Sequence, residues 1–373
     1  MTVRVGRVSF HDWISLPFAD GWSDTFIFRV DARACLPPFA YKPLLQRMAA
    51  AILPKRSSAS LWIQVDSPGA WYLAEVKRAM LPGLRIPYVV TRMGEEPDYC
   101  SFSFRPKLSY SPSARPPMLN DETQALSLEE MRCLQTLARI TLGNELDIAS
   151  LAGLEEDVTK KILAGLEMKK LIVHTVSSKI RGRKSMPLQM DLFPQWSATS
   201  KGLSLALRSW GVPKGIEFTA RSEENLHHIE TGHRHISRRW LSWLRAAYPH
   251  AEIWTGWSEV RLPGTSVIPD ALAWGCIRGY ETLFWLEVGD EHKSRRQIIE
   301  ITKKRLDEAW KFCQRTGVRL VYTQLSVDWV HEAARWEFNQ LPAEVAVVTG
   351  NPRRFGKLPM VEWGKANFNN LNL

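Results

Sequence analysis

The sequence predicts a multidomain α/β protein with a helical domain between two α/β units. Three observations carry this prediction. Strand-like and helix-like patterns alternate over the first third of the 373 residues, helical spacing takes over from Ser127, and a long helix near residue 223 precedes a second alternation of strands and helices. The length suffices for two or three domains. We expect a small α/β domain of unknown role at 1–118, a helical domain at 119–212 and a larger α/β domain at 213–373.

In the first domain, short apolar runs predict strands and helical spacing predicts helices. The expected strands are 25–30, 61–65 and 86–92, and the expected helices are 41–53 and 70–81. The stretch 109–117, SYSPSARPP, is rich in proline and serine, which is typical of a linker.

The helical domain begins with a capping box, Ser127 followed by Glu130. Helices are expected from Leu128, at 146–154 and at 155–171, followed by a strand at 172–176, a basic hairpin tip at 177–187 and a last helix that follows 196–200 and ends near Leu207. Three helices followed by a basic hairpin is the order of a winged helix-turn-helix domain.

In a winged helix, the third helix enters the major groove and the hairpin, or wing, touches the DNA backbone. The cations expected to contact double-stranded DNA are Lys160 and Lys161 on the third helix, and Lys179, Arg181, Arg183 and Lys184 on the wing. A net charge of +10 favours an anionic partner. The alternative for such a charge run is a solvated loop.

The third domain opens with an amphipathic helix at 223–247, whose polar face carries arginines expected to add DNA contacts, Arg234 and Arg238 among them. Its histidines lack the spacing of a zinc site. The elements expected after it are a strand at 253–262, a hairpin of strands 266–274 and 281–289, a helix at 295–313, a strand at 318–323, a helix at 327–338 and a strand at 345–349.

Within the hairpin, side-chain alternation places Asp270 and Glu287 on the same face of neighbouring strands. Two converging carboxylates can hold a hard divalent cation such as Mg²⁺ or Mn²⁺, which can activate water against a phosphodiester. The alternative is a structural Asp and Glu at strand ends.

Pro269-Asp270 and Glu287-Val288-Gly289 resemble the motif of the PD-(D/E)XK nucleases, and helix, three strands, helix, strand is the order of the restriction-endonuclease-like core. The resemblance implies that Asp270 and Glu287 are the metal ligands and catalytic acids. The family places a lysine where this chain has Gly289. A catalytic cation would therefore come from Lys293, or from Lys303 or Lys304, and Glu230 on the long helix would add an outer acid.

The winged helix, the long helix that starts near Leu226-His227, the Pro269-Asp270 strand and the sequence FWLEV at 284–288 together resemble the replication-relaxation proteins of bacterial plasmids and integrative elements. The resemblance covers roughly residues 125–350 and implies a DNA-binding factor of mobile-element maintenance without a secure enzymatic activity. The first functional hypothesis is thus a DNA-binding protein with a degenerate nuclease-like domain. The alternatives are an active Mg²⁺- or Mn²⁺-dependent endonuclease, and a module that recruits replication or transposition proteins.

The five cysteines are widely spaced and form no CxxC pair, as expected of free thiols in a reducing cytosol. The sequence shows no signal-peptide pattern and no apolar run of membrane-spanning length. We therefore expect a cytoplasmic protein without a membrane partner.

Overall fold

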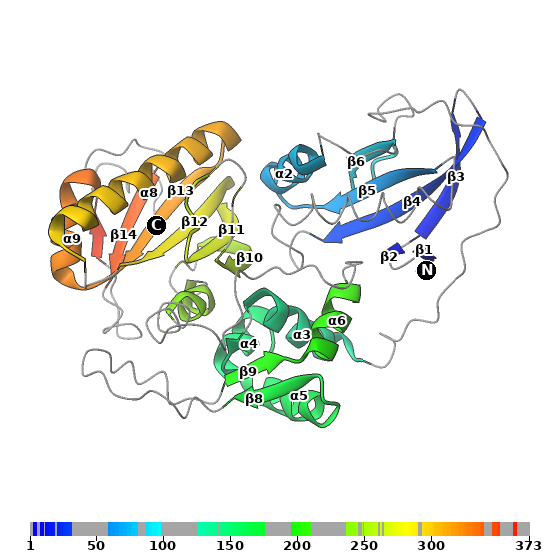
Figure 1. Ribbon diagram of the computed structural model, residues 1–373, viewed down its shortest axis with the longest axis horizontal. Coiled ribbons are helices and arrows are strands. Elements are labelled where there is room, and N and C mark those ends of the chain that lie inside the picture. The colour runs from blue at the N-terminus through cyan, green and yellow to red at the C-terminus, as the bar shows by residue number, and fades with distance from the viewer. Residues whose placement is uncertain are drawn as a thin grey trace. The chain divides into compact units, whose positions relative to one another are not determined.

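The protein is mixed α/β (Figure 1). The computed structural model describes residues 3–5, 8–10, 12–18, 21–31, 59–80, 87–97, 126–140, 142–175, 195–209, 236–244, 248, 250–259, 262, 265–289, 293–338, 345–350 and 361–363. Two compact units are formed: one by Met1–Ala138, Ile162–Ile172 and Ala198–Phe218, the other by Arg139–Lys161, Val173–Ser197 and Thr219–Leu373. The three domains expected from the sequence stay a prediction.

The amino-terminal region is built on a four-stranded sheet of order β3-β4-β5-β6. Its strands are β3 (Asp12–Phe18), β4 (Gly21–Asp31), β5 (Ala59–Asp66) and β6 (Tyr88–Arg92). β3 and β4 pair antiparallel, whereas β4, β5 and β6 run parallel. The parallel pair β5–β6 needs a crossover, which α2 (Ala70–Met80) supplies.

The strands and the helix expected at 25–30, 61–65, 86–92 and 70–81 are confirmed. β3 was not predicted, and neither was the two-stranded sheet of β1 (Val3–Val5) and β2 (Val8–Phe10). The expected helix 41–53 and the linker 109–117 lie outside the described residues.

The helices expected after residue 126 are α3 (Leu128–Ile140), α4 (Glu145–Ala152), α5 (Glu156–Met168) and α6 (Ser200–Ser209). The capping box before α3 is confirmed, because Glu130 N donates to Ser127 Oγ (3.1 Å) and Ser127 N donates to a Glu130 carboxylate oxygen (2.9 Å). A three-stranded sheet has the order β7-β9-β8, with β7 (Leu142–Gly143), β8 (Ile172–Thr175) and β9 (Gln195–Ala198). β7 was not predicted, and the expected wing between β8 and β9 lies outside the described residues.

The carboxyl-terminal sheet has six strands whose spatial order equals their order in the chain: β10 (Ala251–Ser258), β11 (Ala271–Ile277), β12 (Tyr280–Val288), β13 (Arg319–Leu325), β14 (Val345–Gly350) and β15 (Val361–Trp363). β10, β11 and β12 form an antiparallel meander, and β13 and β14 continue parallel to β12. The two parallel connections contain α8 (Arg295–Thr316) and α9 (Asp328–Phe338). The expected order of strands and helices after residue 250 is thus confirmed, and only the edge strand β15 was missed.

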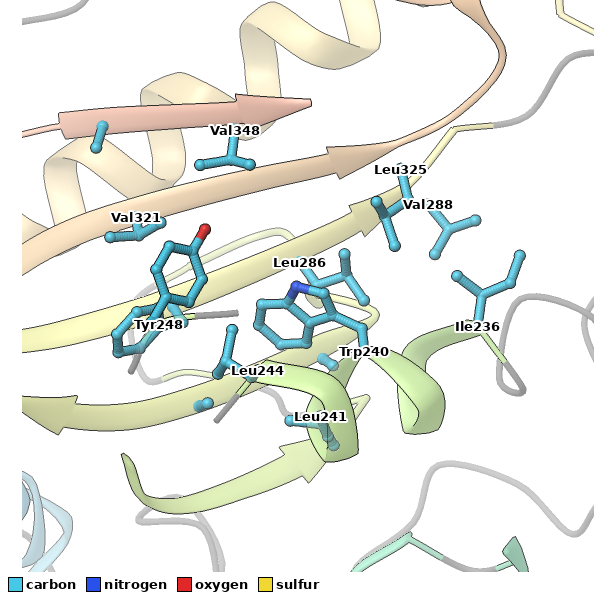
Figure 2. Packing of buried hydrophobic residues seen from close by; sticks show 14 of the residues in the cluster. Ile236, Trp240, Leu241, Leu244, Tyr248, Leu286, Val288, Val321, Leu325 and Val348 are labelled. Carbon is cyan, nitrogen blue, oxygen red and sulfur yellow. The ribbon is translucent and has the colours of Figure 1, made fainter. Parts of the chain in front are cut away.

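The two faces of this sheet differ in chemistry. On one face, Trp240 and Leu244 from the helical residues 236–244 pack on Phe284, Leu286 and their neighbours in a buried apolar cluster (Figure 2). Alternation along β12 sends Trp285 and Glu287 to the opposite face. That face meets α8, because α8 packs on β13 and its Arg305 reaches Glu287. The polar residues of the candidate site are therefore held between a sheet and a helix.

No described helix is both long enough and apolar enough to cross a lipid bilayer.

Candidate functional site

Asp270 and Glu287 lie directly across from each other on neighbouring strands. The antiparallel register pairs Ala271 with Leu286, so the next pair outward is Asp270 with Glu287. Asp270 N–H donates to the carbonyl of Leu286 (3.1 Å), the residue paired with Ala271, so the backbone of Asp270 stays bonded to β12. The Asp270 charge acts on Glu287, and the placement of both carboxylates on one face stays a prediction.

Glu287 is fully buried, at 0% exposure, and both of its oxygens have contacts. The Trp285 indole N–H donates to Oε1 (2.8 Å), and Arg305 Nε lies 3.0 Å from Oε2. Burial raises the pKa of Glu287 above its ordinary value, while Arg305 opposes this increase because its positive charge favours the carboxylate. The Asp270 charge raises the pKa further, whereas Trp285 and Lys293 lower it. Arg305 is thus the principal partner that stabilises a buried negative charge here.

Asp270 is partly buried at the start of β11. Its Oδ2 accepts a hydrogen bond of 2.6 Å from Val288 N–H, so one carboxylate oxygen is committed to the backbone of β12. This hydrogen bond holds the open end of the hairpin together, and it occupies one Asp270 oxygen that a metal ion would otherwise bind.

Residue 289, where the nuclease motif has lysine, is closely packed. A Cβ atom on Gly289 would lie 2.4 Å from Ser326 Oγ, 2.6 Å from Ser326 Cβ and 3.4 Å from Val330 Cγ1. Gly289 N–H also donates to the Leu325 carbonyl (2.8 Å), which holds the backbone against β13. Any side chain at 289 would require Ser326 to move. The sequence identified the missing lysine but gave no sign of this packing.

Among the described residues, the cation that contacts Glu287 is not one of those expected. Lys303 and Lys304 are exposed on α8. Lys293 is partly buried and acts on Glu287 only as the smallest of the causes that shift its pKa. Arg305 makes the direct contact and was missed. Its position could have been predicted, because Ile298, Thr302, Arg305 and Ala309 follow the i, i+4, i+7, i+11 spacing of an inward helix face.

β13 contributes two further polar residues to this face. The parallel register sets Tyr322 beside Trp285 and Gln324 beside Glu287. Burial raises the pKa of the Tyr322 hydroxyl, the nearby charges of Glu287 and Asp270 raise it further, and Arg305 acts in the opposite direction. The Gln324 Oε1 atom is buried and accepts no hydrogen bond from the described residues.

The arrangement of Asp270 and Glu287 does not fit a divalent cation as it stands. Within the described ranges, no group of three or more His, Cys, Asp or Glu side chains is placed to hold a metal ion. Three of the four oxygens of Asp270 and Glu287 already face Val288 N–H, Trp285 N–H or Arg305. A metal ion would have to displace Arg305 to reach Glu287.

Of the residues expected to contact DNA, Lys160 and Lys161 are exposed on α5. Arg238 corrects an expectation: it is 1% exposed and its Nε donates to the Ile140 carbonyl (2.9 Å), so it does not lie on an accessible polar face. Burial lowers its pKa to about 10, and the charges of Asp147 and Glu259 oppose that shift. The other expected residues lie outside the described part of the chain: Lys179, Arg181, Arg183, Lys184, Glu230 and Arg234.

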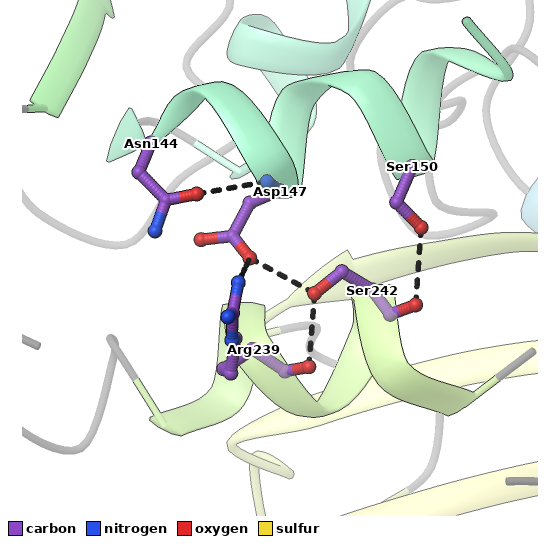
Figure 3. A network of polar contacts seen from close by, with 5 residues as sticks. All are labelled: Asn144, Asp147, Ser150, Arg239 and Ser242. Atoms are coloured by element: carbon purple, nitrogen blue, oxygen red, sulfur yellow. Dashed lines mark hydrogen bonds and ion pairs between the residues drawn. The ribbon is translucent and has the colours of Figure 1, made fainter. Parts of the chain in front are cut away.

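A polar network that the sequence did not predict joins α4 to the helical residues 236–244 (Figure 3). The Asp147 carboxylate accepts from Arg239 (3.2 Å) and from Ser242 Oγ (2.9 Å). The Ser150 hydroxyl donates to the Ser242 carbonyl (3.0 Å). Asn144 caps α4 by accepting from Asp147 N–H (2.8 Å), which orients this acid. Arg239 therefore makes a structural contact within this network.

A scan against models of protein families finds no match for the chain, and a search of curated proteins finds none either. The assignment of function therefore depends on the residues and their geometry.

Proposed function

We propose that this chain is a DNA-binding protein whose carboxyl-terminal sheet is a nuclease-like domain without catalytic activity. The absence of catalytic activity is inferred from the packing of Gly289 against Ser326, which leaves no space for the lysine of the nuclease motif. The buried ion pair of Glu287 with Arg305 supports the same conclusion, because a catalytic carboxylate must be able to reach metal and substrate.

Binding to double-stranded DNA is supported by the helical elements and by charge. The order α3, α4, α5, β8, β9 is that of a winged helix-turn-helix. Lys160 and Lys161 on the third helix are accessible, and the segment between β8 and β9 contains Lys179, Arg181, Arg183 and Lys184 with no acidic residue at 176–187. Backbone phosphates are the natural partners of such a run.

We further propose that the carboxyl-terminal sheet with α8 and α9 is a restriction-endonuclease-like core, and that the chain resembles the replication-relaxation proteins. The meander β10-β11-β12 followed by α8 and β13 supports the first point. On this hypothesis the protein acts in the cytoplasm in the replication, maintenance or transposition of a bacterial mobile element, with the corresponding proteins as partners.

A salt titration of binding to duplex DNA tests the proposal. Because phosphate contacts release counterions, the logarithm of the binding constant should fall linearly with the logarithm of salt concentration, with a slope of roughly −0.9 per contact. Changing Lys160 and Lys161 to Gln should weaken binding and flatten the slope. The matched control changes Lys303 and Lys304, an adjacent exposed pair on α8, to Gln. A salt-independent affinity, or an equal effect of both double variants, would contradict binding through the helical elements.

An active endonuclease is the second candidate, and one observation favours it. Both Lys293 and Arg305 act electrostatically on Glu287, so a cation displaced from the motif is present near the acids. Cleavage of supercoiled plasmid in Mn²⁺ by wild type, absent in Asp270→Ala, would establish this activity and refute a catalytically inactive domain.

A further inference from the structure

We propose that Arg305 is a built-in cation that takes the place of a divalent metal ion at the Asp270 and Glu287 carboxylates. The inference builds on the proposed absence of catalysis and supplies its cause, but it does not depend on DNA binding. The first support for the inference is the position of Arg305, whose Nε lies 3.0 Å from Oε2 of the fully buried Glu287.

The charges of the site support this role. Among the residues that the structure describes, the charged groups that act on Glu287 are the carboxylate of Asp270 and the cations Arg305 and Lys293. Within this described set two acids are balanced by two cations, which leaves no excess negative charge for a divalent ion. Such an ion would also meet the Arg305 guanidinium at close range, where like charges repel strongly in a buried environment.

The carboxylate oxygens of Asp270 and Glu287 also support the role of Arg305 in place of a metal ion. Mg²⁺ requires near-octahedral oxygen coordination and Mn²⁺ likewise favours oxygen ligands. Glu287 Oε1 accepts from Trp285 N–H, Glu287 Oε2 faces Arg305, and Asp270 Oδ2 accepts from Val288 N–H. If Arg305 were removed, Glu287 Oε2 would become accessible beside Asp270. The buried Gln324 Oε1, next to Glu287 in the strand register, would supply a third oxygen.

The structure also explains how the chain keeps the arginine there. Arg305 projects from the inward face of α8 between Thr302 and Ala309, and its side chain is 24% exposed. The helix is fixed by the capping box of Ser294 and Gln297 at one end and by Gly317 in the left-handed conformation at the other. The guanidinium is therefore held in position by the fold itself.

The test is a titration with Mn²⁺, followed by the electron paramagnetic resonance signal of the free ion. Wild type should show no saturable binding, whereas Arg305→Ala should bind Mn²⁺, and the double variant R305A/E287Q should lose it again. Saturable binding by wild type that Glu287→Gln abolishes would overturn the inference, and so would a folded R305A protein that binds no Mn²⁺. If a wild type that binds duplex DNA also shows saturable Mn²⁺ binding that Glu287→Gln abolishes, this inference alone would be overturned and DNA binding would stand.

A second measurement needs no metal and applies if Arg305→Ala folds poorly. Glu287→Gln, Arg305→Met and the double variant are compared by thermal unfolding in EDTA. If the two side chains are each other's counter-ions, the double variant should lose less thermal stability than the sum of the two single losses. Additive losses would show that Arg305 is not the cation of this site.

Discussion

Ser326 occupies the space that a side chain at residue 289 would need. Its Oγ and Cβ atoms lie 2.4 and 2.6 Å from the position of a Cβ on Gly289. The backbone on both sides is fixed, since Gly289 N–H donates to the Leu325 carbonyl and Ser326 N–H to the Gly350 carbonyl. The glycine is therefore a packing requirement of the present fold as well as a departure from the nuclease motif.

Restoring the motif with Gly289→Lys should fail to produce a nuclease. The new side chain has to displace Ser326, so we expect a less stable protein and no cleavage of plasmid DNA in Mn²⁺. The smaller change Gly289→Ala should lower the free energy of unfolding by about 1–3 kcal/mol, as overpacking does. Ser326→Gly is the matched control: combined with Gly289→Ala it should recover part of the loss. Denaturant unfolding measures both, and a fully stable Gly289→Ala protein would contradict the close contact.

Asp147 should be important for stability because two donors depend on it. Asp147→Ala leaves Arg239 and Ser242 without this acceptor, and we expect a loss of about 1–3 kcal/mol in the free energy of unfolding. Glu332→Ala, which changes an exposed acid on α9, should alter stability by less than about 0.5 kcal/mol. Equal stabilities of the two variants would argue against the network of Figure 3.

His331 should make the protein sensitive to acid. Burial lowers its pKa below the ordinary value of 6.5, and its Nε2 lies 2.9 Å from the Ser326 carbonyl and 3.1 Å from the Gly350 carbonyl. The unfolded chain therefore binds a proton more readily than the folded one, so stability should fall as pH drops through about 6.5. His331→Gln should be less stable at pH 7 yet show a smaller loss between pH 7 and pH 5. An unchanged pH dependence of the free energy of unfolding would exclude His331 as its source.

The thiols of Cys133 and Cys313 should resist alkylation in the native protein. Both are buried, burial raises the pKa of Cys133 to about 12, and it raises that of Cys313 as well. Because the thiolate is the reactive form, iodoacetamide should modify these two cysteines only in denaturant. Cys276, which is less buried, is the internal reference in the same peptide mapping. Native-state modification of Cys313 at the rate of Cys276 would contradict the packing of α8.

The sequence predicted most elements because local signals agree with the fold. Apolar runs defined β5, β11 and β12, and capping residues defined the starts of α3 and α8. Alternation predicted the hairpin, but the expected first strand at 266–274 differs from β11 (Ala271–Ile277), because the turn lies at Arg278-Gly279, where both residues have positive φ. Features that depend on tertiary contacts were not predicted. Arg305 and Ser326 are distant in the chain from the residues they contact. Arg238 was expected on the polar face of its helix because arginine is charged, but its side chain is buried.

In the carboxyl-terminal sheet each strand pairs with the strand that precedes it in the chain, from β10 to β15. The antiparallel pairs β10–β11 and β11–β12 are local in the chain, so little loop-closure entropy is lost when they form, whereas the parallel pairs must close over α8 and α9. The hairpin that joins Asp270 to Glu287 closes over a two-residue turn, and Arg305 arrives one helix later. The two acids are therefore joined by a local hairpin, whereas their counter-ion comes from the helix that follows it in the chain.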